Sequence, residues 1–379
     1  MRRCDAVVVG GGPAGSSCAW ALRRGGADVV VVDRASFPRD KVCAGWVTPA
    51  VVAALELDTD EYRRGRTFQP ITAFRTGRID PRSRDVETRY DRPVSFGIRR
   101  CEFDHYLLCR SGADVRPATP ITSLRREGER WLVNEEIEAP VLVGAGGHFC
   151  PVARHLGGGG GSEPIVAAQE YEVPLDGAED CAVRAEAPEL YFAPDLKGYG
   201  WCFRKQRVIN VGYGRFGGDR LSVHVAGFLD FLRQRARLPA SLTGRLKGHA
   251  YLLYDTTPRP LVGDGVLLVG DAAGLACAPS GEGIRTAVES GLLAAQTIRE
   301  ARGGFDRARL EPYRARIEAR FGRRRSGGRG RLIPSRVVEA LGAGLLASSW
   351  LTRRVVLDRW FLHAGQPALV GRGRAQASL

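Results

Sequence analysis

Three glycines near the N-terminus have the spacing of a site for a nucleotide pyrophosphate. Gly10, Gly12 and Gly15 follow a short apolar run at residues 6–9. Gly10 permits a tight turn, Gly12 lets the backbone approach the phosphates, and Gly15 lets the following helix pack closely. The free N–H groups at the start of that helix would face the anion. Asp33, at the end of the next predicted strand, is placed to accept hydrogen bonds from ribose hydroxyls.

A second glycine-rich segment lies far along the chain, at residues 270–283. An apolar strand at 265–270 leaves Asp271 at its carboxyl edge, where open α/β sheets bind ligands. The stretch from Pro279 to Gly283 then leads into a long predicted helix. A helix start flanked by glycines offers bare N–H groups to an anionic edge, such as that of a reduced flavin.

The elements that must position these residues follow from hydrophobic patterning. Continuous apolar runs at 6–9, 27–32 and 265–270 predict buried parallel strands. Alternation over 164–215 predicts an antiparallel sheet. Helices are expected at 16–24, 99–111, 222–237 and from about 283. A hairpin followed by a return strand is expected at 130–143. Residues 60–95 are polar and aperiodic and are expected to leave the first domain, and residues 157–161 form a flexible glycine connector.

This pattern predicts an α/β (α+β) protein with three parts. A Rossmann-like domain, which the resemblance described below makes FAD-binding, would comprise residues 1–65, 96–160 and 250–302. An antiparallel-sheet substrate domain would comprise 66–95 and 161–249, and a basic helical C-terminal region 303–379.

The composition limits the setting and the partners. The formal net charge of +14 fits either an Arg-rich composition or an anionic substrate or membrane surface, and no recognisable nucleic-acid module is present. The nine cysteines form no CxxC pair, and no signal peptide or membrane span is recognisable. We expect a cytoplasmic protein without a metal site. Its seven Arg at 320–336, beside an apolar stretch ending at Trp350, suit either peripheral membrane contact or a helix docked on the body.

The segment from Gly270 to Gly283 resembles flavoproteins of the para-hydroxybenzoate hydroxylase fold. The resemblance implies FAD, with Asp271 at the ribityl or phosphate region and Gly281 and Gly283 near the isoalloxazine. Arg100, with Phe103 and Asp104, resembles the helix of that family whose arginine reaches the FAD phosphates. We therefore expect an FAD-dependent oxidoreductase.

Two further segments resemble the geranylgeranyl reductase branch. Phe37 to Gly45 resembles its "FPR.K.CGG" motif with Ala44 in place of a glycine, and Tyr199 to Phe203 resembles "Y.W.FP" with Arg204 in place of proline. Cys43 would lie beside the flavin, as a tuning group or proton donor, or else as a small buried side chain. The aromatic residues would wall an apolar substrate channel or be plain core.

The candidate catalytic residues are Cys43, Trp46, Tyr199 and Trp201. The candidate cofactor-binding residues are Gly10, Gly12, Pro13, Ala14, Gly15, Asp33, Arg34, Arg39, Cys43, Ala44, Arg100, Gly270, Asp271, Pro279, Gly281, Glu282 and Gly283.

The expected activity is reduction of C=C bonds in an isoprenoid or other apolar substrate, and the alternative is a monooxygenase acting on a small aromatic or natural-product substrate. Gly146 stands where the resembled family often has an aspartate that helps to position a nicotinamide donor, so NAD(P)H and ferredoxin both remain candidate electron donors. Arg154 stands in its expected place, and a proton-relay role for His148 has no support from a visible partner.

Overall fold

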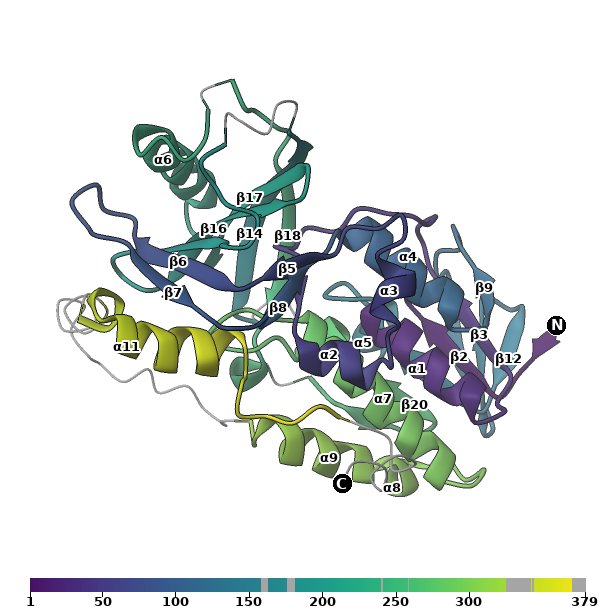
Figure 1. Ribbon diagram of the computed structural model, residues 1–379. Coiled ribbons are helices and arrows are strands. Elements are labelled where there is room, and N and C mark those ends of the chain that lie inside the picture. Colours follow the sequence, from purple (N-terminus) through teal and green to yellow (C-terminus); the bar gives the residue numbers. More distant parts are fainter. Residues whose placement is uncertain are drawn as a thin grey trace, which may run out of the picture.

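A computed structural model describes residues 1–157, 163–175, 181–239, 241–257, 259–324, 342 and 344–369 (Figure 1). Its cofactor half is built on a six-stranded sheet, parallel except for the edge pair β19–β20. In spatial order its strands are β19 (Val262–Gly263), β20 (Val266–Leu268), β13 (Val141–Gly144), β2 (Ala6–Val9), β3 (Val29–Val32) and β9 (Asp114–Arg116). The runs of valine in β2 and β3 are fully buried, as continuous apolar strands of a covered parallel sheet should be.

Two helices that carry the glycine-rich segments pack against each other beside this sheet (Figure 1). They are α1 (Pro13–Arg24) and α7 (Ile284–Glu300). A Cβ atom at Gly291 of α7 would lie 2.2 Å from the Ala14 carbonyl oxygen, so only glycine allows this approach. The two glycine-rich segments, distant in sequence, are thereby held together.

The second half is built on a seven-stranded sheet, antiparallel except where β15 runs parallel to β6. Its strands in order are β18 (Lys247–Leu252), β14 (Ile165–Pro174), β17 (Val208–Phe216), β16 (Gly198–Lys205), β15 (Glu189–Phe192), β6 (Ala73–Arg78) and β7 (Val86–Arg89). Helix α6 (Leu221–Gln234) covers one face through Phe228 and Phe231.

Smaller elements complete the structure. One four-stranded sheet contains β1 (Arg2–Arg3), β12 (Ile137–Ala139), β11 (Arg130–Val133) and β10 (Leu124–Glu127), and a three-stranded sheet contains β4 (Trp46–Val47), β8 (Ser95–Gly97) and β5 (Gln69–Ile71). The short helices are α2 (Pro49–Ala54), α3 (Thr59–Tyr62), α4 (Arg100–Arg110), α5 (Pro151–His155), η2 (Tyr254–Thr256) and η3 (Gly270–Ala273).

The C-terminal region is helical where it is described. It contains α8 (Arg307–Leu310), α9 (Pro312–Phe321), α11 (Ser349–Leu351) and the π-helix η4 (Thr352–Phe361). Figure 1 shows α11 and η4, in yellow, lying beside β7 at the edge of the seven-stranded sheet. No helix among the described residues is long and apolar enough to cross a bilayer.

Most predicted elements are confirmed, and two expectations need correction. Helix α1 begins at Pro13 and not at Ser16, because proline is well tolerated in the first turn of a helix. The segment 60–95 is not irregular but contains most of α3 and four short strands: β5 pairs with β8 and β6 with β7, while β8 and β6 also pair with β4 and β15. Such short strands carry too few residues for a periodic pattern to stand out. Residues 158–161 of the glycine connector lie outside the described residues.

Candidate active site

A single large cavity, of about 790 Å³, extends from the glycine-rich turns of the six-stranded sheet to the inner face of the seven-stranded sheet. Most of the residues selected from the sequence line it, including all four candidate catalytic residues. Gly15, Gly270 and Pro279 do not line it. Gly15 instead allows close packing, because a Cβ atom there would lie 1.9 Å from the Gly10 carbonyl oxygen.

The first glycine turn is fixed by backbone geometry and by Asp33. Gly10 has a φ of 115°, and a Cβ atom there would lie 2.3 Å from the Ala145 carbonyl oxygen. Asp33 accepts hydrogen bonds from the Gly11 N–H at 2.7 Å and from the Ala35 N–H at 2.8 Å. Asp33 therefore already holds the turn itself, a role that the sequence did not indicate.

Two arginines that line the cavity, Arg39 and Arg100, share the buried carboxylate of Asp104. Arg100 binds Asp104 through two hydrogen bonds of 2.8 and 2.7 Å, and Arg39 Nη2 lies 3.3 Å from the same carboxylate. Arg39 also approaches the glycine turn, since a Cβ atom at Gly12 would lie 3.3 Å from its Nη2. The group keeps a net positive charge, which suits a phosphate. The geometry favours Arg39 for that contact, whereas Arg100 is bound to Asp104 and interacts with Cys43.

Asp271 is held by two basic side chains that the list of candidate residues did not include. Lys41 Nζ lies 3.0 Å and His249 Nε2 3.7 Å from Asp271 Oδ2. Burial opposes ionisation of Asp271, but the two bases outweigh it and keep its pKa well below the usual range. Burial also lowers the pKa of His249. Lys41 belongs to the segment from Phe37 to Gly45 that resembles the reductase motif, so it is the one of these two bases that the sequence could have identified.

These residues fit the FAD that the family resemblance implies. The glycine turn leaves space where a side chain would block a pyrophosphate, and Arg34, Arg39 and Arg154 line the same part of the cavity. At the other glycine-rich turn, Gly281 has a φ of 67° and tolerates no Cβ atom, because Tyr251 Oη would lie 2.2 Å away. The bare backbone of residues 281–283 therefore faces the cavity, as an isoalloxazine edge would require.

The opposite end of the cavity is an aromatic wall. Trp46 stacks on Phe203 at 4.8 Å between ring centroids, and Tyr199 lies 5.9 Å from Trp201. Phe361 of η4 completes the cluster, 5.4 Å from Tyr199 and 5.6 Å from Trp46. The polar ends of two rings are bonded: Tyr199 Oη donates to the Ser280 carbonyl at 2.5 Å, and Trp201 Nε1 to Asn210 Oδ1 at 2.7 Å. These two bonds satisfy the polar atoms of the wall, the first of them on Ser280, which also lines the cavity.

Cys43 lies between the two ends. Its side chain lines the cavity, its N–H donates to Glu170 Oε1 at 2.7 Å, and its carbonyl accepts from Asn210 Nδ2 at 3.4 Å. Glu170 and Asn210 are not among the candidate site residues, because nothing local in β14 or β17 distinguishes them from other polar residues of those strands, such as Gln169, Glu172 and Arg215. Burial raises the pKa of Glu170 to about 7, against the hydrogen bond from the Cys43 N–H.

Gly146 stands where the resembled family often has an aspartate, and the space for a side chain there is limited. A Cβ atom there would lie 3.2 Å from Cys150 Sγ and 3.3 Å from Cys150 Cα, so a longer side chain would require movement of α5. His148 lines the cavity nearby, and burial together with Arg259 lowers its pKa.

Part of the basic C-terminal cluster is structural. Arg320 forms hydrogen bonds of 2.8 and 2.6 Å with the buried Glu289, and Arg324 donates to the carbonyl oxygens of Arg259 and Ala273. These arginines hold α9 and its C-terminal end to the body. Arg323 lies 3.7 Å from Glu318, and residues 325–341, which include the other four arginines of that cluster and the start of the apolar stretch, lie outside the described residues.

Comparisons with known proteins agree with this geometry. Residues 5–78 match the FAD dependent oxidoreductase family. The chain is 30% identical over 345 residues to menaquinone reductase of Mycobacterium tuberculosis, covering 84% of this chain and 81% of the relative. It is 30% identical to geranylgeranyl diphosphate reductase of Rhodobacter capsulatus, covering 77% and 74%.

Among solved structures, a geranylgeranyl bacteriochlorophyll reductase-like protein of Thermoplasma acidophilum superposes with a TM-score of 0.76 at 21% identity, covering 95% of this chain and 97% of that one. A flavin-dependent brominase shares the fold more distantly, with a TM-score of 0.67 at 16% identity. The chain is thus an FAD-dependent oxidoreductase, and it belongs to the geranylgeranyl reductase family.

Proposed function

We propose that the protein reduces C=C bonds of an isoprenoid or similarly apolar substrate. The observation that carries the proposal is the continuity of one cavity from a positively charged, backbone-lined end to an aromatic wall, with Cys43 between them. When bound, reduced FAD supplies the hydride equivalent that one alkene carbon requires. The two most similar reductases described above bear names of prenylated substrates, a quinone and a diphosphate, which supports an apolar chain.

The residues of the chain would supply the rest of the chemistry. The aromatic wall of Trp46, Tyr199 and Trp201 binds the chain and excludes water. Cys43 donates its thiol proton to the second alkene carbon, and solvent then returns a proton to the thiolate. Arg100, which interacts with the Cys43 side chain, stabilises the thiolate formed in that step.

The test is a single-turnover experiment under anaerobic conditions. Dithionite-reduced protein is mixed with a geranylgeranyl lipid, and the flavin spectrum and the product mass are followed. Flavin reoxidation with a gain of two hydrogens per reduced bond is the expected result, and the saturated lipid should leave the flavin reduced. Unchanged prenyl lipids combined with oxygen-dependent hydroxylation of a soluble aromatic compound would instead establish the monooxygenase alternative.

The electron donor is proposed to be NAD(P)H or a reduced ferredoxin that binds transiently. Gly146 lacks the carboxylate expected near a bound nicotinamide. The other Gly-x-Gly-x-x-Gly spacing in the sequence, at Gly212, Gly214 and Gly217, falls in and just after strand β17 and not at a strand-to-helix turn like that of Gly10 to Gly15. Anaerobic titration with NADH, NADPH and reduced ferredoxin, each against a dithionite reference, distinguishes them by the rate of flavin bleaching.

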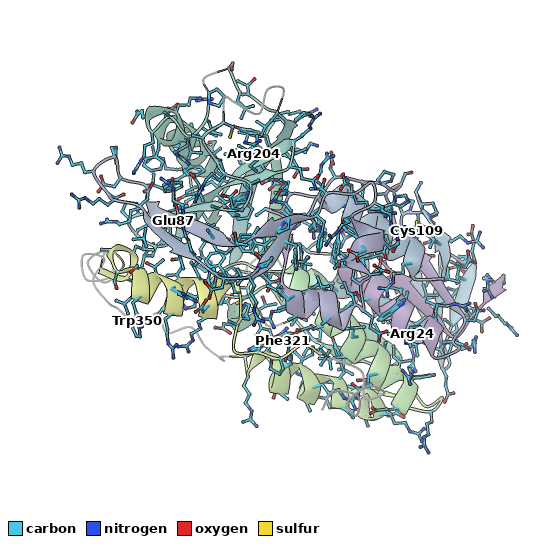
Figure 2. All side chains as sticks on the ribbon, in the orientation of Figure 1. Arg24, Glu87, Cys109, Arg204, Phe321 and Trp350 are labelled. Atoms are coloured by element: carbon cyan, nitrogen blue, oxygen red, sulfur yellow. The ribbon has the colours of Figure 1, made fainter. Side chains whose placement is uncertain are left out.

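We also propose peripheral contact with an anionic membrane through α11 and η4. Figure 2 shows Trp350 on this yellow helical segment, where its side chain is 65% exposed. Arg354 and Arg359 are exposed, with no carboxylate within 4.0 Å among the described residues. The opposite face, including Phe361, packs on the aromatic wall. A bilayer seated here would lie next to the apolar end of the cavity.

Vesicle sedimentation tests that contact. Vesicles with one third phosphatidylglycerol should retain the protein at low salt, and Arg354→Glu/Arg359→Glu should weaken retention by at least about 30-fold, because each of the two lost arginine charges contributes about 1 kcal/mol. Arg63→Glu/Arg64→Glu, a charge-matched change on α3 and its C-terminal end, serves as the control. Equal retention of both double variants would contradict this surface.

A further inference from the structure

Two side chains of the seven-stranded sheet hold the backbone of Cys43 from opposite sides. Glu170 Oε1 accepts the Cys43 N–H at 2.7 Å, and Asn210 Nδ2 donates to the Cys43 carbonyl at 3.4 Å. Both peptide units that flank this residue are therefore anchored. The rotation of the loop that carries the thiol is restricted as a result.

The anchor is built into the sheet. Glu170 of β14 lies opposite Gly212 of β17, two residues beyond Asn210. A Cβ atom at Gly212 would lie 2.7 Å from Glu170 Cβ and 2.3 Å from the Trp201 ring. Only glycine at this position lets the carboxyl group and the indole ring occupy adjacent places. Glu170 is itself 5% exposed, so its hydrogen bond is shielded from water.

Asn210 connects the same loop to the aromatic wall. Its Oδ1 accepts from Trp201 Nε1 at 2.7 Å, and its Nδ2 also donates to Glu172 Oε2 at 3.3 Å. Glu172 is fixed in turn by Lys205 and Arg99, each at 2.9 Å. Because the amide group uses both its oxygen and its nitrogen, its orientation is determined. The positions of Cys43 and Trp201 are thereby coupled through one side chain.

We propose that Glu170 and Asn210 are positioning residues, which hold the Cys43 thiol in the cavity at a fixed place relative to Trp201. This inference rests on the proposed function in one respect only, which is that the Cys43 thiol serves as the proton donor. The part played by Glu170 is that of a hydrogen-bond acceptor, which a glutamine can also supply. Asn210 supplies both the donor to the loop and the acceptor for the indole.

Alkylation of Cys43 measures the position of the thiol without any turnover. FAD-loaded protein is treated with iodoacetamide, and the Cys43 peptide is quantified by mass spectrometry. Loss of a hydrogen bond worth about 1.4 kcal/mol should raise the alkylation rate about tenfold in Glu170→Ala. Glu170→Gln, which keeps the acceptor, should remain within about twofold of wild type, and Asn210→Ala should resemble Glu170→Ala.

A matched control is Glu189→Gln, which alters another carboxylate of the same sheet, 1% exposed and bonded to Tyr191 and Arg237. It should leave Cys43 alkylation unchanged. The proposal would be overturned if Cys43 were alkylated at the wild-type rate in Glu170→Ala. It would also be overturned if Glu170→Gln and Glu189→Gln raised the rate of Cys43 alkylation equally. With a prenyl substrate, Glu170→Ala should lower kcat about tenfold with little change in KM. A wild-type protein that reduces no prenyl lipid would disprove the proposed function alone, because alkylation still decides the positioning role.

Discussion

The two ends of the cavity are built by different means. At the cofactor end the backbone faces the cavity, in turns such as residues 10–15 and 281–283. At the substrate end the side chains of Trp46, Tyr199 and Trp201 do so, and Phe361 packs against Trp46 and Tyr199; these residues come from distant parts of the chain. A backbone surface needs consecutive small residues, whereas a side-chain surface needs only one residue from each element. The first end should therefore be intolerant of any added atom, and the second should respond to changes in polarity and hydrogen bonding.

The largest effect is expected at the cofactor end, from Gly10→Ala. The new methyl group would meet the Ala145 carbonyl oxygen at 2.3 Å in a backbone with a φ of 115°. We expect unfolding free energy to fall by more than about 3 kcal/mol and FAD affinity by more than about 100-fold. Flavin absorbance per protein and urea unfolding measure both.

Gly26→Ala is the matched control for backbone strain. Gly26 also has a positive φ, of 86°, but nothing lies within 4 Å of its would-be Cβ atom. It should cost about 1–2 kcal/mol and leave FAD content unchanged. If Gly10→Ala retained wild-type FAD, the backbone would not form the cofactor end as described.

A smaller effect is expected at the substrate end, from the ionisation of Glu170. Burial raises the pKa of Glu170 from its ordinary 4.5 to about 7. Between these pH values the folded protein keeps a proton that the unfolded chain has lost, so stability falls as pH rises. The total change is about 3 kcal/mol. Urea unfolding at several pH values should show a flatter profile for Glu170→Gln than for wild type and Glu189→Gln; superimposable profiles would refute the raised pKa.

The smallest effect is expected where the two ends meet, at Lys41. This lysine precedes Cys43 by two residues and binds Asp271 at 3.0 Å. Lys41→Met removes a positive charge from the cavity and should weaken FAD binding about tenfold, as measured by flavin fluorescence. Lys247→Met should change it by no more than about twofold, because Lys247 is 54% exposed in its pair with Asp40. Equal losses in both variants would mean that total charge, and not the Asp271 pair, governs binding.

The same contrast explains what could be predicted from the sequence. The fold class, most elements and the residues of the glycine turns follow from local spacing, because backbone features need neighbouring residues. The aromatic residues of the "Y.W.F" strand were visible through the family resemblance. The contacts that Glu170 and Asn210 make with Cys43 were not, since Cys43 lies more than a hundred residues away from both and the strand register brings the three together. Arg39 and Arg100 could be selected by type, but which one approaches the glycine turn depends on the position of Asp104.

Phe361 has a consequence for the order in which the protein is completed during synthesis. The last strand of the six-stranded sheet ends at Leu268 and helix α7 at Glu300, so the strands and helices that carry the glycine turns are made before the C-terminal region. The aromatic cluster, by contrast, gains its contact between Phe361 and Tyr199 only when nearly the whole chain has been made. Because domains form as the chain emerges, the glycine turns can begin to form while the core around them still lacks Tyr313 of α9 and the apolar end of the cavity still lacks Phe361.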